Sequence, residues 1–268
     1  MIRVLQKLLK RVLSPAAFWR TKYCWWYIRV YTLRRFIAIF IQRPPAVSGP
    51  SSDFADKIRG VNTFATTEMC RVMTQFGSDK GRFNHNYTTI YSALFGSLRD
   101  QPLRIFELGI GTNNLNLASS MGAMGRPGAS LRGWRALFPK AQVFGADIDR
   151  DILFADDGIR TFYCDQLDSN AIRDLWAQAA MEGGLDIIVD DGLHSFPGNA
   201  SFLAGSLEQV RAGGVYIVED ITDGDLVEWR RALDGYVSKY SNFDFAIVQL
   251  PAPSNPGDNN LLMIRRRS

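Results

Sequence analysis

The stretch FELGIGTNN, residues 106–114, decides the fold of this chain. An apolar run that ends at Glu107 and Leu108 is followed by Gly109 and Gly111, so a strand passes into a tight turn. Glycines at such a turn let the backbone approach a ligand closely, and they supply open amide groups at the carboxyl edge of a sheet. A tight strand–helix turn without a ligand has the same pattern, so other parts of the chain must decide between the two.

Short apolar runs recur after residue 100, and helical patterns lie between most of them. The runs indicate strands at 103–108, 142–146, 159–163, 185–190, 213–218, 243–249 and 260–265. The helical patterns lie at about 128–138, 169–181, 198–211 and 225–239. Strands that alternate with helices are typical of a Rossmann-like α/β fold. We therefore expect a mostly parallel, seven-stranded sheet with helices on both faces.

The chain of 268 residues divides into three predicted parts. Residues 1–43 form a basic, aromatic extension, residues 44–55 a linker that contains the run PPAVSGPSS, and residues 56–268 the α/β domain. The three cysteines are scattered and two histidines are present, which argues against a disulfide framework, a zinc site and a multi-histidine metal cage. A reducing cytoplasm is the expected compartment.

Residues 1–43 carry ten Lys and Arg and no Asp or Glu, whereas the remainder carries 21 basic and 27 acidic side chains. The best membrane-spanning candidate, 23–41, contains Arg29, Arg34 and Arg35, each of which costs about 2.5–3.5 kcal/mol at a bilayer centre. We therefore expect peripheral attachment to an anionic membrane surface at the inner face of the membrane. Nucleic acid fits less well, because Trp-rich apolar segments suit lipid better than phosphates. The remaining alternative is that the aromatic residues pack on the protein's own body or in a homo-oligomer contact.

The residues around the glycine turn indicate which ligand it binds. Position 114 is Asn, so the GxGxxG pattern of nicotinamide-dependent dehydrogenases is incomplete. Glu107 would repel a pyrophosphate, but it suits the ammonium group of a methionyl ligand. We therefore predict that S-adenosylmethionine binds at Glu107, Gly109 and Gly111.

Two further strand ends deliver polar groups to the same edge of the sheet. The motif GADID, 145–149, places Asp147 where a carboxylate can accept hydrogen bonds from both hydroxyls of a ribose. The next strand continues into Asp165 and Gln166, which are placed to meet an adenine. Three successive strand ends together predict a nucleoside pocket far more strongly than any single motif.

A cluster of acids follows the next two strands. The strand LDIIVD continues into Asp191 and, three residues later, His194, and the strand after it ends at Glu219 and Asp220. Neighbouring strands lie about 5 Å apart, so these acids should converge and require a cation, for which hard Mg²⁺ is suited. His194 is placed to take the proton of a metal-bound hydroxyl as its oxygen attacks the sulfonium methyl group. A surface or structural role is the alternative for this histidine.

With these residues in place, the chain resembles the metal-dependent sugar O-methyltransferases typified by the mycinamicin and macrocin enzymes. The resemblance covers about 74–225, and its specific part is VDDGLH with GGVYIVED, since FELGIG is shared with many methyltransferases. It implies that Mg²⁺ is held by Asp191, Glu219 and Asp220, and that Asp191 and His194 are catalytic, with His194 as general base. It also implies donor contacts from Glu107, Gly109, Ser130, Asp147, Asp165 and Gln166.

The segment GSDKG…HNYT, 77–88, is a further mark of the resemblance. It would cap the methionine end of the donor or the acceptor, with Lys80, His85 and Tyr87 as candidates, and helix packing onto the sheet is the alternative. The loop 112–127 differs from the family, so acceptor contacts cannot be transferred to it.

The sequence therefore predicts a Mg²⁺-dependent O-methyltransferase that uses S-adenosylmethionine and acts on a sugar hydroxyl. The basic N-terminus favours a lipid-linked glycan or a surface polysaccharide as acceptor, and the resemblance also allows a glycosylated natural product. A phenolic or catechol-like acceptor is the alternative, because a metal site suits vicinal hydroxyls of both kinds. Two other classes are a nicotinamide-dependent oxidoreductase, against which Glu107 counts, and a non-catalytic membrane-bound scaffold, against which the acid cluster with His194 counts.

Overall fold

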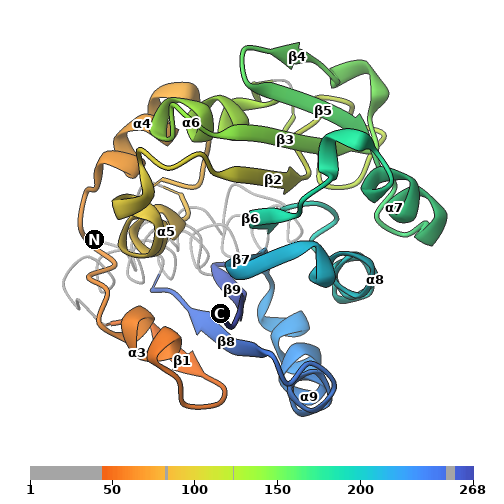
Figure 1. The fold of residues 1–268 in the computed structure, drawn as a ribbon. Helices are drawn as coiled ribbons and strands as arrows, with labels where there is room; N and C mark the ends of the chain where they lie inside the picture. The colour runs from red at the N-terminus through yellow and green to blue at the C-terminus, as the bar shows by residue number, and fades with distance from the viewer. Residues whose placement is uncertain (1–43, 82–83, 123, 252–256) are drawn as a thin grey trace, which may run out of the picture. The chain divides into compact units, whose positions relative to one another are not determined.

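The computed structural model describes residues 44–81, 84–122, 124–251 and 257–268 (Figure 1). The chain divides into two units, Met1–Gln42 and Arg43–Ser268, and every element named here belongs to the second. The predicted basic extension, 1–43, and its membrane contact lie outside the described residues. Within the described part, no helix is both long enough and apolar enough to cross a bilayer.

A nine-stranded sheet forms the centre of the second unit, in the order β1-β8-β9-β7-β6-β2-β3-β5-β4. Strands β7, β6, β2, β3 and β5 run parallel, whereas β9, β8 and the short edge strands β1 and β4 pair antiparallel with their neighbours. The Rossmann-like α/β prediction is confirmed, but the count of seven strands is wrong and the sheet is mixed, because two short edge strands join the seven predicted runs. The strands are β1 (Ala46–Ser48), β2 (Arg104–Leu108), β3 (Gln142–Asp147), β4 (Ala155–Asp156), β5 (Ile159–Tyr163), β6 (Leu185–Asp190), β7 (Val210–Ile221), β8 (Phe243–Gln249) and β9 (Asn260–Arg266).

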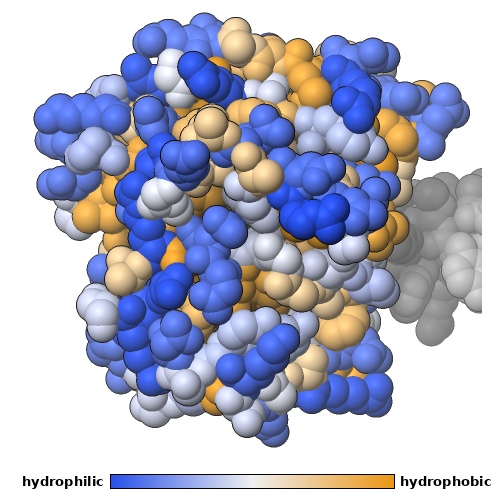
Figure 2. Space-filling view, turned by 45° about the vertical axis from the view of Figure 1, so that its right-hand side comes forward, coloured by the Kyte–Doolittle hydropathy of each residue, from blue (hydrophilic) through white to orange (hydrophobic). Residues whose placement is uncertain are grey.

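Helices cover both faces of the sheet, as predicted. Successive strand residues point to opposite faces, so Ile105 and Ile187 belong to one apolar core, and Phe106 and Ile188 to the other. The first core is covered by α3 (Asp53–Arg59), α4 (Glu68–Phe76), α5 (Tyr87–Phe95) and α6 (Ala129–Leu137), and the second by α7 (Ser169–Trp176), α8 (Phe196–Ser206) and α9 (Asp223–Lys239). Short 3₁₀ turns are η1 (Gly96–Leu98), η2 (Arg150–Ile152), η3 (Ala179–Met181) and η4 (Leu207–Gln209). Figure 2 shows one face of the outer surface, where hydrophilic residues predominate and hydrophobic residues form smaller patches.

The stretch predicted to be a linker, 44–55, contains regular structure. Strand β1 pairs with β8, and Ser52 caps the N-terminus of α3, whose Phe54 is buried. Gly49 follows β1 with a φ of 126°, in the region that favours glycine. An edge strand needs ladder hydrogen bonds on one side only, so the Pro and Gly content of this stretch does not prevent it. Within the described residues, this stretch therefore contributes the edge strand β1 and the first turn of α3.

The carboxyl ends of the parallel strands lie at one edge of the sheet, and the predicted site residues follow them. Strand β7 continues past this edge, and its register with β9 shifts between Val218 and Ile221. Asp220 lies in this irregularity with a φ of 52°. The departure from regular strand geometry places the Asp220 side chain toward the neighbouring loop after β6, where it meets His194.

Candidate active site

A cavity of about 550 Å³ lies at the carboxyl edge of the sheet. Most residues predicted for the donor and the metal line this one cavity: Gly109, Gly111, Ser130, Asp147, Asp165, Gln166, Asp191, His194 and Asp220. Lys80 lines it as well, whereas Glu107 and Glu219 are absent from its wall. The structure therefore brings the two predicted halves of the site together.

The glycine turn joins the two halves through the backbone. Gly109 and Gly111 have φ values of 79° and 85°, which side-chain-bearing residues rarely adopt. A Cβ atom at Gly109 would lie 2.0 Å from the carbonyl oxygen of Asp191. The amide of Gly109 donates to the carbonyl of Ala146 at 2.8 Å, so this amide is used within the fold. Glycine at 109 is required by the contact with the loop after β6.

Asp147 is held against the same turn. Its carboxylate accepts hydrogen bonds from the amides of Ile110 at 3.0 Å and Asp149 at 2.9 Å. Burial raises the pKa of Asp147 above its ordinary value, and the backbone hydrogen bonds oppose that rise. The carboxylate is thus fixed at the wall of the cavity, where the prediction places a ribose.

Gln166 connects the end of β5 to the loop after β6. Its Nε2 donates to Asp190 Oδ1 at 3.0 Å, and its Oε1 accepts from the amide of Leu193 at 2.7 Å. Asp165 beside it accepts a hydrogen bond from the amide of Leu167 at 2.9 Å. Gln166 thereby helps to shape the loop that carries Asp191 and His194, in addition to lining the cavity.

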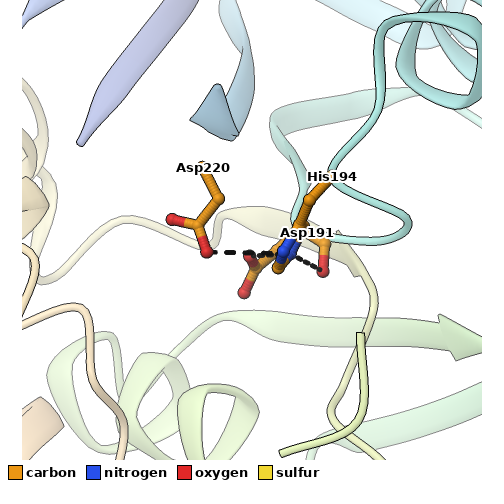
Figure 3. A group of neighbouring side chains, drawn as sticks. All are labelled: Asp191, His194 and Asp220. Atoms are coloured by element: carbon orange, nitrogen blue, oxygen red, sulfur yellow. Dashed lines mark hydrogen bonds and ion pairs between the residues drawn. The ribbon is translucent and has the colours of Figure 1, made fainter. Parts of the chain in front are cut away.

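Asp191, His194 and Asp220 gather at the cavity wall (Figure 3). His194 Nε2 lies 3.2 Å from Asp191 Oδ1 and 3.7 Å from Asp220 Oδ2. One donor atom from each of the three residues lies within 4.8 Å of the others. His194 has a φ of 53°, a conformation that is costly for a non-glycine residue and that clusters at functional sites. Two carboxylates this close suit a hard divalent cation such as Mg²⁺.

The charges of the two acids set the protonation of His194. Burial favours the neutral imidazole, but the hydrogen bond and charge of Asp191, with the charge of Asp220, raise the pKa of His194 to about 10. Burial and the charge of Asp191 raise the pKa of Asp220 to about 6. The imidazole is therefore protonated at neutral pH unless a metal ion binds these carboxylates.

Lys80 places a buried positive charge beside the acids. Its side chain is 2% exposed, and its Nζ lies 2.5 Å from Asp191 Oδ2 and 3.5 Å from Glu107 Oε1. Nζ also donates a hydrogen bond to Glu219 Oε2. Burial alone would lower the pKa of Lys80, but the charges of Asp191, Glu107 and Glu219 raise it well above its ordinary value. The ammonium group is therefore charged at any physiological pH.

Glu107 lies beneath the cavity wall. It alternates on β2 with Phe106 and so shares the face of Ile105, which α6 covers. Its carboxylate accepts hydrogen bonds from Ser130 Oγ at 2.5 Å and from Trp134 Nε1 at 2.7 Å. Burial raises its pKa. Its predicted contact with the donor ammonium stays a prediction, and the observed partners of its carboxylate belong to α6 and Lys80.

Glu219 is buried in the same way on β7, on the face that Ile217 shares. Its two oxygens accept hydrogen bonds from the Tyr91 hydroxyl and from Lys80 Nζ. Burial raises its pKa well above the ordinary value. Its predicted role as a Mg²⁺ ligand stays a prediction, whereas Asp191 and Asp220 already face a common point.

The segment 77–88 contacts the acids more directly than its sequence indicates. The Tyr87 hydroxyl donates to Asp220 Oδ1 at 2.7 Å, and His85 Nδ1 lies 3.5 Å from the same oxygen. Lys80 and Tyr87 are candidates for capping the donor or acceptor by sequence, and their contacts with the acids are not foreseen. The sequence signal that could have indicated the Lys80 contact is the need for a nearby cation where several acids converge.

The Rossmann-like fold of this chain is similar to that of solved methyltransferase structures. A solved structure of the MycE methyltransferase from the mycinamycin biosynthetic pathway, in complex with Mg, SAH and mycinamycin VI, matches with a TM-score of 0.57. The match has 22% sequence identity and covers 76% of this chain and 56% of that chain. A second crystal form, in complex with Mg and SAH, gives a TM-score of 0.55 at 22% identity, over 76% of this chain and 54% of that chain.

Curated relatives narrow the likeness to enzymes that methylate sugars. A tetracenomycin rhamnosyl 3′-O-methyltransferase of Streptomyces olivaceus is 32% identical over 154 residues, or 58% of this chain and 37% of that protein. Mycinamicin VI 2″-O-methyltransferase of Micromonospora griseorubida is 30% identical over 58% of this chain and 36% of its own length. Demethylmacrocin O-methyltransferase of Streptomyces fradiae is 28% identical over 59% of this chain and 38% of its own length.

These relatives confirm the resemblance to the mycinamicin and macrocin enzymes that the sequence motifs indicate. No family model matches the chain. The chain spans less than two fifths of the length of the curated relatives it matches. The matched region of this chain is therefore similar to part of each relative.

Proposed function

We propose that this chain is a Mg²⁺-dependent O-methyltransferase that moves a methyl group from S-adenosylmethionine to a sugar hydroxyl. The proposal is carried by one observation: Asp147 and Gln166 line the same cavity as Asp191, Asp220 and His194. A nucleoside pocket and an acid pair that share one cavity can hold a methyl donor beside a hydroxyl. The names of the curated relatives support the sugar acceptor.

The donor half of the cavity fits S-adenosylmethionine. Asp147 is a fixed carboxylate acceptor for ribose hydroxyls, and Asp165 and Gln166 follow the next strand, where an adenine would lie. The acids Asp191 and Asp220 line the other half of the cavity. The acidic character of that half suits a donor that carries a positive charge.

Asp191 and Asp220 would hold the ion, because both line the cavity and bring carboxylate oxygens close together. A bound Mg²⁺ lowers the pKa of a coordinated alcohol. Compensation of the two carboxylates by a divalent charge also removes the cause that holds the His194 imidazole protonated. His194 Nε2 can then accept the hydroxyl proton.

These groups account for every bond and proton in the methyl transfer. The acceptor oxygen forms a bond to the methyl carbon, the carbon–sulfur bond breaks, and the proton goes to His194 Nε2. The products are a methyl ether and S-adenosylhomocysteine, and the imidazolium returns its proton to solvent. His194 is partly exposed, which leaves a route for that proton.

We further propose that the acceptor sugar is carried by a lipid-linked glycan, a surface polysaccharide or a glycosylated natural product. The charge of residues 1–43 supports attachment to an anionic membrane surface at the cytoplasmic face. Attachment there would place the cavity near acceptors that are held in the membrane.

Calorimetry should show that the full chain binds S-adenosylmethionine and S-adenosylhomocysteine, because the pocket is built for a nucleoside beside an acidic surface. NADH should give no heat of binding. Turnover is then measured as S-adenosylhomocysteine release with a panel of rhamnosides, other glycosides and catechol. Products that gain one CH₂ in mass spectrometry with glycosides, and none with catechol, would support the sugar acceptor; binding of NADH alone would refute the proposal.

Removal of residues 1–43 should release the protein from anionic vesicles. We expect the full chain to sediment with phosphatidylserine-containing vesicles and less so at high salt, since screening weakens attraction between basic residues and lipid headgroups. Neutral phosphatidylcholine vesicles are the control. Sedimentation of the 44–268 fragment with anionic vesicles, to the same extent as the full chain, would rule out the anchor.

A further inference from the structure

Asp191 and Asp220 are each held by one carboxylate oxygen and offer the other to the cavity. Lys80 Nζ binds Asp191 Oδ2 at 2.5 Å, and Asp191 Oδ1 faces His194. The Tyr87 hydroxyl binds Asp220 Oδ1 at 2.7 Å, and Asp220 Oδ2 faces His194. Both holding groups come from the segment 77–88, which lies between β1 and β2 in the sequence and far from the two acids. The second oxygen of each acid is directed to His194 Nε2 at the cavity wall.

Lys80 is itself held in place by buried acids. An ammonium group has three protons to donate, and Lys80 Nζ has three carboxylate neighbours, on Asp191, Glu219 and Glu107. Glu107 and Glu219 are fully buried and carry further hydrogen bonds from Ser130, Trp134 and Tyr91, which restrict their movement. The position of the Lys80 ammonium group is therefore fixed, and its contact at the cavity wall is Asp191.

We propose that Lys80 is a positioning residue for Asp191. Its ammonium group, which Glu219 and Glu107 hold in place, binds one oxygen of Asp191. The other oxygen is thereby directed toward Asp220 and a divalent cation. The inference rests on the proposed function and adds to it a residue that acts on the metal through Asp191. A group that fixes the orientation of a metal ligand commonly changes metal affinity by about 10–100-fold when it is removed.

A different role for Lys80 predicts the opposite change in metal affinity when the lysine is removed. If the ammonium only compensated negative charge, it would repel a divalent cation nearby, and its removal would tighten metal binding. The two roles are therefore separated by the direction of a single measured change. The observed geometry favours positioning, because Lys80 occupies Oδ2 and leaves Oδ1 of Asp191 to the cavity.

The test is a titration of the full-length Lys80→Met variant with MnCl₂, in which electron paramagnetic resonance measures free Mn²⁺. We expect the Kd for Mn²⁺ to rise about 10–100-fold relative to wild type. The Kd for S-adenosylhomocysteine, measured by calorimetry, should change much less. Raising Mn²⁺ should restore part of the lost turnover. Lys239→Met, at an exposed lysine on α9, is the matched control and should bind Mn²⁺ as wild type does.

Removal of Lys80 leaves buried acids without their cation, which can prevent folding. The double variant Lys80→Met/Glu107→Gln removes one negative charge together with the ammonium, and it leaves Asp191 and Asp220 unchanged. It should fold more readily than Lys80→Met and still bind Mn²⁺ more weakly than Glu107→Gln alone. Thermal unfolding of each variant shows which of them to titrate.

Three results would overturn the proposal. Lys80→Met could bind Mn²⁺ as tightly as wild type or more tightly, or the double variant could match Glu107→Gln. Failure of both variants to fold would make Lys80 a structural residue. A wild-type chain that binds no Mn²⁺ and no S-adenosylmethionine would instead remove the proposed function, so the two failures are distinguishable.

Discussion

The His194→Ala variant is expected to bind S-adenosylmethionine nearly as well as wild type and to transfer the methyl group about 10²–10⁴ times more slowly. In the wild-type chain, His194 Nε2 lies 3.2 Å from Asp191 Oδ1 and 3.7 Å from Asp220 Oδ2, next to the point where a metal-bound hydroxyl would lie. No other imidazole lines the cavity among the described residues. Single-turnover release of S-adenosylhomocysteine, with an acceptor found in the glycoside panel, measures the rate.

The same variant distinguishes a base from a metal ligand. His194 contributes one of the three donor atoms that lie within 4.8 Å of one another, so it could also bind the ion. Loss of a ligand would raise the Kd for Mn²⁺, and excess Mg²⁺ would then restore the rate. Loss of a base would leave the Kd nearly unchanged, and added imidazole would restore part of the rate. A rate within threefold of wild type would rule out both roles.

Removal of the divalent cation is expected to abolish turnover altogether. Excess EDTA should stop S-adenosylhomocysteine release, and Mg²⁺ added back should restore it, because Asp191, His194 and Asp220 bring possible ligand atoms within 4.8 Å of one another. The Asp220→Asn variant should bind Mn²⁺ at least about tenfold more weakly, since an amide donates poorly to a hard cation and Tyr87 would lose its charged acceptor.

Asp234→Asn is the matched control for this experiment, because Asp234 is an exposed acid on α9 outside the cavity. It should retain wild-type turnover and Mn²⁺ affinity. Full activity in EDTA after dialysis would show that the acids have no role in metal binding. The parallel variant Glu219→Gln tests the remaining predicted ligand: a loss as large as that of Asp220→Asn would make Glu219 a third ligand.

The position of these residues at the carboxyl edge of the sheet could be predicted from the sequence, because strand ends are local signals. An apolar run followed by Gly109, Asp147, Asp165 or Asp191 places each group at the carboxyl edge, and every one of them lines the cavity. Helices α6 to α9 were predictable for the same reason, because they alternate with these strands. The edge strands escaped prediction: β4 has only two residues, and β1 lies in a run rich in Pro, Gly and Ser.

The burial of Glu107 and Glu219 could also have been predicted, from the alternation of side chains along each strand. Side chains alternate between the faces of a strand, so an acid two residues after Ile105 or Ile217 points into the core that Ile105 and Ile217 share. That alternation is readable in the sequence, and it predicts burial beneath the cavity rather than exposure in it. The contact with Lys80 was not readable, because 139 residues separate Lys80 from Glu219.

The near-contact between Gly109 and the Asp191 carbonyl fixes a distance without the use of any side chain. If a donor and an ion bind as proposed, main-chain packing would hold the glycine turn beside the loop that carries Asp191. Under the proposed function, substitutions in the loop 112–127, part of which lines the cavity, would change the space for an acceptor while this main-chain contact is preserved. Descendants of such a protein could therefore acquire new acceptors by drift in one loop, with the reaction geometry inherited intact.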